Sequence, residues 1–82
     1  MTKNEEDLEA LKISARDVLR EKIMAIYHKN KVDRSMSEYE REALDQYYKD
    51  YKALNGNSYI DKRMNRMVKW SVIFDEETDD EE

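Results

Sequence analysis

A single glycine, Gly56, and a complete lack of proline most constrain how this chain can fold. Glycine and proline are the residues that interrupt helices most strongly, so their scarcity favours long helices. Charged residues make up 43% of the sequence and hydrophobic residues 39%, a balance typical of amphipathic helices around a thin core. The chain is therefore predicted to form one all-α domain over residues 1–74.

Apolar periodicity predicts three helices, at about residues 5–29, 37–54 and 58–70. Their short links favour a three-helix antiparallel bundle or, alternatively, a helical hairpin to which the third helix is added. Residues 71–74 either extend the third helix or fold back as an extended segment over the core. The first helix carries an apolar stripe that is too short to predict a coiled coil by itself: Leu8, Leu11, Ala15, Val18, Leu19, Ile23 and Ile26.

Capping residues mark the limits of the second helix. Ser37, followed three residues later by Glu40, fits a capping box at its N-terminus. Its other end is expected at Gly56, in the left-handed conformation that ends many helices. Either Asn57 or Ser58 then caps the third helix.

The net charge of −5 is distributed unevenly. The last eight residues, DEETDDEE, hold seven of the twenty acids, which leaves fifteen bases against thirteen acids in residues 1–74, a net charge of +2. Like charges repel and offer no apolar surface to bury, so residues 75–82 are expected to form a disordered acidic tail. Such a tail would either mimic nucleic acid toward a basic protein or keep a small helical domain in solution.

Composition also bears on the compartment. The chain has no cysteine, which suits a reducing cytosol, and its longest apolar run, residues 72–74, is far shorter than the ~20 residues of a membrane span. The acidic N-terminus lacks the apolar segment of a signal peptide. A soluble intracellular protein without membrane association is expected.

The residues around Gly56 do not fit a catalytic, phosphate or ion site. His28 is the only histidine and no cysteine is available to pair with it, so we predict no catalytic residues. Phosphate-binding loops use several glycines, and this corner has one. An EF-hand needs a glutamate six residues after its glycine, where this chain has Lys62. We predict neither a metal nor a cofactor, and a structural corner is the favoured reading.

The segment YEREALDQYYKDYKALNGNSYIDKRMNRM, together with LREKIMAIYHKN before it, resembles a group of small helical accessory proteins from phages and prophages of Gram-positive bacteria. The resemblance covers roughly residues 15–68. It departs from the group's pattern at Asn55, where a second glycine is common, and in the acidic tail. It implies a phage source, a helical fold, and a location in the host bacterial cytoplasm or the virion, and it implies no particular activity. The most specific part is a Tyr-x-x-Tyr-x-x-Leu-x-Gly-Asn spacing at Tyr48, Tyr51, Leu54, Gly56 and Asn57.

The third helix carries the candidate binding residues. Tyr59, Arg63, Arg66 and Trp70 fall within roughly 60° of one another on a helix and form our predicted protein-binding face. Lys62, Arg63, Arg66 and Lys69 form the alternative, a nucleic-acid-binding face after a helix-turn-helix-like turn. These basic residues could also be a solvated surface balanced by nearby acids.

From these features we expect a small non-catalytic phage accessory protein that acts by binding another protein, host or phage, or a second copy of itself. Its role would be that of a virion or assembly component, or of an inhibitor of a host process. The alternative is a nucleic-acid-binding regulator that uses the third helix.

Overall fold

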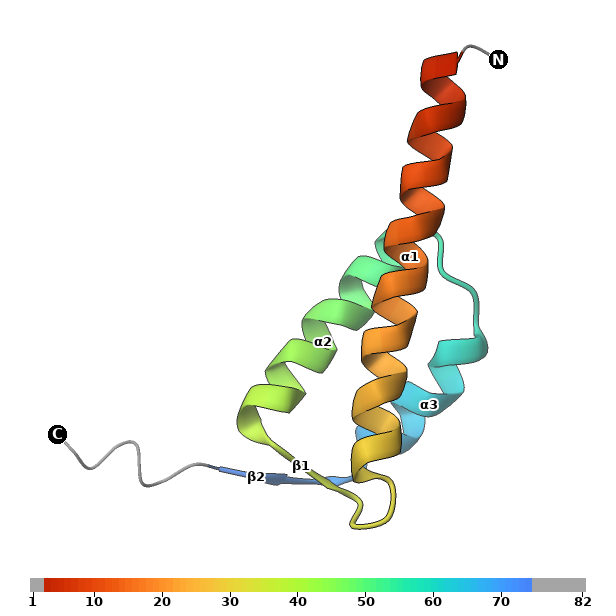
Figure 1. The fold of residues 1–82 in the computed structure, drawn as a ribbon. Helices are drawn as coiled ribbons and strands as arrows, with labels where there is room; N and C mark the ends of the chain where they lie inside the picture. The colour runs from red at the N-terminus through yellow and green to blue at the C-terminus, as the bar shows by residue number, and fades with distance from the viewer. Residues whose placement is uncertain (1–2, 75–82) are drawn as a thin grey trace, which may run out of the picture.

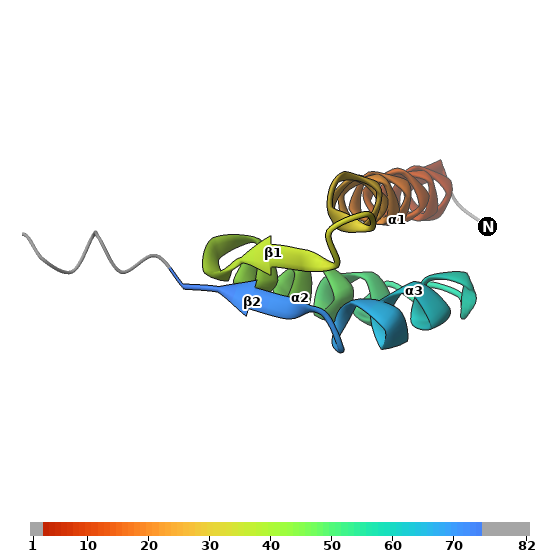
Figure 2. The same ribbon diagram turned by 90° about the horizontal axis from the view of Figure 1, so that it is seen from below.

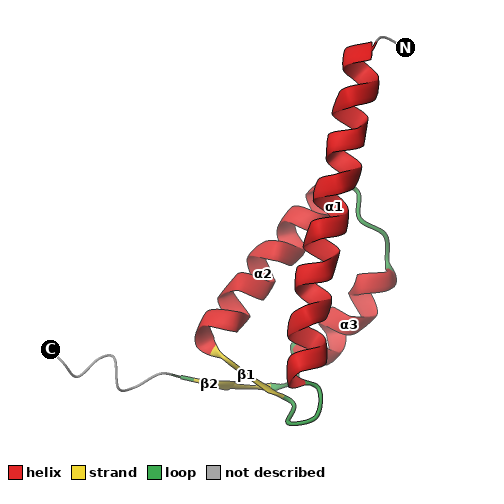
Figure 3. Cartoon of the chain, in the orientation of Figure 1, coloured by secondary structure: helices red, strands yellow, loops and turns green. Residues whose placement is uncertain are grey.

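The computed structural model describes residues 3–74, which form three helices and one small sheet (Figure 1, Figure 3). The mainly helical fold predicted from the sequence is confirmed, whereas the sheet was not predicted. The acidic tail, residues 75–82, lies outside the described residues. In chain order the elements are α1 (Lys3–Asn30), β1 (Ser35–Ser37), α2 (Glu38–Ala53), α3 (Tyr59–Met67) and β2 (Ser71–Ile73).

Successive helices run in opposite directions, and α1 packs against both of the others (Figure 1). Seen from below, α1 lies on one side, while α2, α3 and both strands lie on the other (Figure 2). The core between them is small, as expected of a chain of this size. Its buried residues are Ile23, Met36, Leu44, Tyr51, Ile60, Met64 and Met67.

Only part of the predicted stripe on α1 reaches this core. Ile23 is buried and Leu19 and Ile26 are half-buried, but Leu8, Leu11 and Val18 are exposed. The reason is length: at 1.5 Å per residue α1 is about 42 Å long and α2 about 24 Å. No helix within residues 3–74 has the length and apolar character to cross a membrane.

A parallel pairing of β1 with β2 closes one end of the fold, with Met36 opposite Val72. Residues 71–74 therefore take the extended alternative and do not continue α3. The run Ser-Val-Ile-Phe is rich in residues that favour strands over helices. This explains why α3 ends at Met67 and not at the predicted residue 70.

The corner between α2 and α3 corrects the predicted role of the glycine. The left-handed residue is Asn55, with φ of 64°, and Gly56 has no positive φ. The amide of Gly56 donates to the carbonyl of Tyr51 at 2.9 Å, and the amide of Asn55 donates to that of Lys52 at 3.0 Å. These two bonds form a Schellman motif, in which Asn55 takes the position that glycine usually occupies.

Gly56 is needed because it has no side chain, and not because of its backbone conformation. A Cβ atom at this position would overlap the aromatic ring of Tyr51, which is buried. The Tyr51 hydroxyl donates to Oδ1 of Asn57 at 3.2 Å, and the same oxygen accepts from the amide of Tyr59 at 3.0 Å. Asn57 thus caps the start of α3, whereas Ser58 makes no side-chain capping bond.

The predicted capping box at the start of α2 is confirmed. The amide of Glu40 donates to Oγ of Ser37 at 3.0 Å, and the amide of Ser37 donates to Oε1 of Glu40 at 3.1 Å. The other carboxylate oxygen of Glu40 accepts from Nζ of Lys29 at 2.8 Å. This side chain therefore links the last turn of α1 to the first turn of α2.

Candidate binding site

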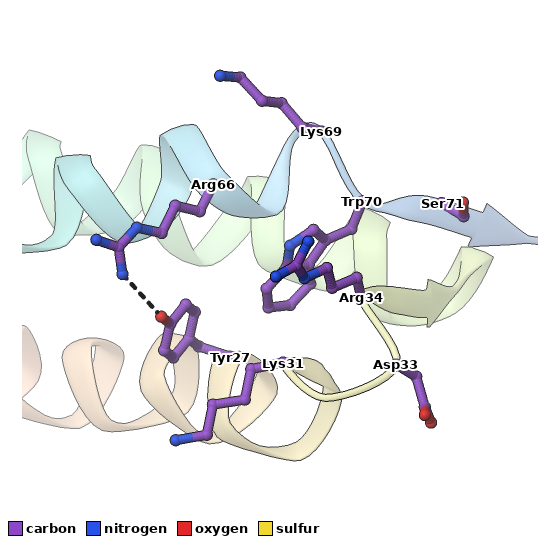
Figure 4. Close-up of a pocket in the computed structure, with 8 residues that line it drawn as sticks. All are labelled: Tyr27, Lys31, Asp33, Arg34, Arg66, Lys69, Trp70 and Ser71. Atoms are coloured by element: carbon purple, nitrogen blue, oxygen red, sulfur yellow. Dashed lines mark hydrogen bonds between the residues drawn. The ribbon is translucent and has the colours of Figure 1, made fainter.

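An open pocket of about 710 Å³ lies where the end of α1, the α1–β1 turn and the end of α3 meet (Figure 4). It is formed by segments that are far apart in the sequence and are brought together by the sheet. The amide of Ser71 donates to the carbonyl of Arg34 at 3.1 Å, which fixes the turn beside β2. The pocket is lined by Tyr27, Lys31, Asp33, Arg34, Arg66, Lys69, Trp70 and Ser71.

Two stacked aromatic rings form one wall of this pocket, the basic–aromatic pocket. The centroids of Tyr27 and Trp70 are 5.6 Å apart and their planes differ by 22°. Nη1 of Arg66 donates to the Tyr27 hydroxyl at 3.0 Å, which ties α3 to α1 (Figure 4). Both rings are half-buried, so they present apolar surface to the pocket while remaining fixed in position.

Positive charge dominates the lining. The lining has one acid, Asp33, and therefore a net charge of +3 from four bases: Lys31, Arg34, Arg66 and Lys69. None of the ion pairs among the described side chains involves these four cations. Cations gathered around one depression attract anionic groups.

The backbone of the α1–β1 turn is shaped to place Arg34 at this pocket. Arg34 has φ of 56°, a left-handed conformation that is uncommon for a residue other than glycine. Its amide donates to the carbonyl of Asn30 at 2.7 Å, which caps the end of α1. The turn therefore reverses the chain within four residues and brings Arg34 beside Trp70, while Lys31 lines the same pocket from the end of α1 (Figure 4).

The predicted protein-binding residues divide into two groups. Arg66 and Trp70 line the pocket, but Trp70 follows the end of α3 and is no longer on the helix. Tyr59 and Arg63 pair with each other, with the guanidinium carbon 4.3 Å from the ring centroid. Nε of Arg63 is buried without a hydrogen-bond partner, which is consistent with stacking taking precedence in this half-buried side chain.

Tyr59 lines a different and smaller depression of about 360 Å³ against α1. Of the alternative set, Arg66 and Lys69 line the larger pocket, whereas Lys62 is exposed outside it. The structure thus brings together half of each predicted set and adds Tyr27, Lys31 and Arg34, which the sequence-based prediction missed. The excess of bases in HKNKVDRS, residues 28–35, was a signal that could have pointed to Lys31 and Arg34.

The titratable groups with perturbed pKa values lie away from this pocket. The Tyr48 hydroxyl donates to Oδ1 of Asp61 at 2.6 Å, and this bond, followed by burial, raises the pKa of Tyr48 to about 12. The same bond, with Lys52 nearby, lowers the pKa of Asp61. Lys29 and the Ser37 amide lower the pKa of Glu40. These contacts join helices, and none lines the pocket.

Comparisons of the chain with protein-family models, with curated proteins and with solved structures find no match. Within the part of the chain that the structure describes, no three His, Cys, Asp or Glu side chains are grouped so that they could hold a metal ion.

Proposed function

We propose that this protein is a small non-catalytic binding protein whose basic–aromatic pocket receives an acidic segment of another protein. One observation carries the proposal: four cations line the same pocket as the Tyr27–Trp70 wall, and none of them forms an ion pair with another side chain of residues 3–74. Carboxylates would contact the cations, and an apolar or aromatic side chain of the ligand would pack on the wall. The supporting frame is the antiparallel helical bundle, closed at the pocket end by the sheet.

A protein partner fits the dimensions of the pocket better than a long nucleic acid does. The four basic residues of the pocket line a single depression. The net charge of residues 1–74 is only +2, which is low for a protein that binds along a polyphosphate backbone. A short acidic segment needs only a few charged contacts and gains from the aromatic wall.

A nucleic acid is the second candidate ligand, because Arg66 and Lys69 of the predicted basic face lie beside the stacked rings. Bases stack on aromatic side chains while cations hold the phosphates, the combination that single-strand-binding proteins use. The two candidates differ in what they predict for Lys62, which belongs to the basic face of α3 and lies outside the pocket.

The resemblance to phage and prophage accessory proteins gives this proposal a biological setting. In that setting the protein acts in the host bacterial cytoplasm or in the virion, as an assembly component or as an inhibitor of a host process. Its partner would then be a host or phage protein with an exposed acidic segment.

Affinity capture from a lysate of a Gram-positive host tests the proposal with a matched pair of variants. The Lys69→Glu variant should lose the partner that the parent protein retains, because a pocket cation is reversed. We expect roughly tenfold weaker binding, the cost of about 1.4 kcal/mol of electrostatic attraction. The Lys62→Glu variant makes the same charge change on α3 outside the pocket and should retain the partner.

A gel shift with single-stranded DNA, using the intact chain and a chain ending at Phe74, separates the second candidate. Salt-dependent binding that Lys69→Glu and Lys62→Glu weaken equally would favour a nucleic-acid-binding face along α3. Equal retention of the captured protein by Lys69→Glu and the parent would contradict the proposed role of the pocket.

A further inference from the structure

Far from the pocket, the N-terminal half of α1 carries apolar side chains that no other described element covers. Leu8, Leu11 and Val18 are 56%, 67% and 49% exposed, and Ala15 between them is also exposed. In Figure 1 this part of α1 projects beyond α2 and α3. We call these four residues the α1 stripe.

The α1 stripe has the spacing of a helix-pairing surface. Its residues are separated by three, four and three positions, as the a and d residues of two heptads are. At 100° per residue, the centre of the stripe lies about 100° around α1 from the buried Ile23. A second helix can therefore lie along the stripe without displacing α2 or α3.

We propose that the occupant of the α1 stripe is the same stripe of a second copy, paired in parallel about a two-fold axis. The charged residues beside the stripe favour the parallel direction over the antiparallel one. Taking Leu8 as an a position, parallel pairing sets Asp7 of each copy beside Lys12 of the other, which gives two attractive contacts. Antiparallel pairing centred on the same stripe would set Asp7 beside Glu21 and the two Lys12 side chains beside each other.

The rest of the molecule is compatible with this arrangement. The core-facing side of α1 lies about 100° from the stripe, so the two-fold axis places the two sets of α2 and α3 on opposite sides of the helix pair. The α2 and α3 helices of one copy therefore do not clash with those of the other. The small side chain of Ala15, near the middle of the seam, lets the two helices approach closely.

Lys22 limits the length of the contact. It occupies the next a position, where its Nζ lies 5.8 Å from the centroid of the Tyr47 ring. A charged residue at this position ends the apolar seam after four layers, and the buried area falls below the ~1,200 Å² of a stable interface. We expect a weak dimer, with a dissociation constant on the order of 100 µM.

Sedimentation equilibrium of the full chain over a concentration series reaching about 1 mM measures this association. Leu11→Lys should weaken the dimer at least tenfold, because it places charge in the seam. Ile13→Lys is the matched control: Ile13 is 43% exposed on the same stretch of α1 and lies outside the stripe. Circular dichroism should show both variants folded, because neither residue belongs to the buried core.

The direction of pairing has its own test. Asp7→Lys should weaken the parallel dimer, and adding Lys12→Asp should restore it. A stronger dimer with Asp7→Lys would indicate antiparallel pairing with Glu21 and overturn the proposed arrangement. Three results would overturn the seam itself. The parent chain could remain monomeric throughout the series, or it could form a species larger than a dimer. In the third, Ile13→Lys would weaken the dimer as much as Leu11→Lys does. None of these outcomes bears on ligand binding at the pocket, which lies elsewhere.

Discussion

At the scale of single residues, three neighbouring positions together form the corner that ends α2 and begins α3, and each has a different role. Asn55 adopts the left-handed backbone, Gly56 leaves room for the Tyr51 ring, and Asn57 accepts the hydrogen bond that starts α3. The position of the corner could be predicted from the sequence, because a lone glycine between polar residues marks a break. The separate roles of these three residues could not be predicted, because the role of Gly56 depends on the buried ring of Tyr51.

Replacing the glycine tests this description of the corner. Gly56→Ala should lower the free energy of unfolding by about 1–3 kcal/mol, the usual cost of forcing extra atoms into a packed site. Thermal or urea unfolding measures the change. Asn55→Gly is the control and should stay within about 1 kcal/mol of the parent, because glycine adopts the left-handed conformation freely. Unchanged stability of Gly56→Ala would show that the ring and the corner are not packed as described.

At the scale of the elements, a few polar contacts hold the helices where the small core cannot. The Tyr48 hydroxyl joins α2 to Asp61 of α3, and Lys52 lies 3.4 Å from the same carboxylate. Lys29 of α1 similarly reaches Glu40 of α2. These contacts set how the helices lie relative to one another, and they respond to pH.

The Tyr48–Asp61 contact predicts a defined dependence of stability on pH. Asp61 has a pKa below its ordinary value in the folded protein, so its contribution is present above that ordinary value and is lost as pH falls through the folded pKa. Tyr48 has a pKa raised from 10.0 to about 12, so its contribution is present below pH 10 and is lost as pH rises from about 10 to about 12. The contact therefore stabilises the fold between these two limits.

Unfolding of Tyr48→Phe across this range checks the prediction. The variant should be less stable than the parent at neutral pH, and the difference should shrink at both the acid and the alkaline limits. Tyr39→Phe is the control, since Tyr39 lies on the same helix with its ring exposed. A difference between Tyr48→Phe and the parent that does not vary with pH would argue against the charged hydrogen bond.

How much of each element could be predicted depends on whether its signal is local. The helices could be predicted because their signals are local. The apolar periodicity repeats every three or four residues, and the capping pair Ser37 and Glu40 is three residues apart. The strands are three residues long, and each needs a partner that lies more than thirty residues away. The same reason explains which lining residues the sequence could single out: Arg66 and Trp70 lie in one segment, whereas Tyr27 and Arg34 are brought to them only by the fold.

At the scale of the whole molecule, α1 separates two surfaces with different chemistry. The sheet end carries cations around two stacked rings, and the projecting end carries the apolar α1 stripe. A pair of molecules joined along α1 would present two pockets, so a partner with repeated acidic segments would be held by both. We predict that an acidic ligand binds more tightly when residues 75–82 are removed, because these acids carry the same charge as the ligand.

Fluorescence of Trp70 offers the most direct measurement of ligand binding at the pocket, because Trp70 is the only tryptophan in the chain and lines the pocket. The probe is a synthetic peptide with the sequence DEETDDEE, titrated into the chain ending at Phe74 and into the full chain. We predict a saturable, salt-sensitive change in emission that is weaker for the full chain, is lost in Lys69→Glu and persists in Lys62→Glu. No change in emission at any peptide concentration, or an equal loss in both variants, would contradict the pocket as the binding site.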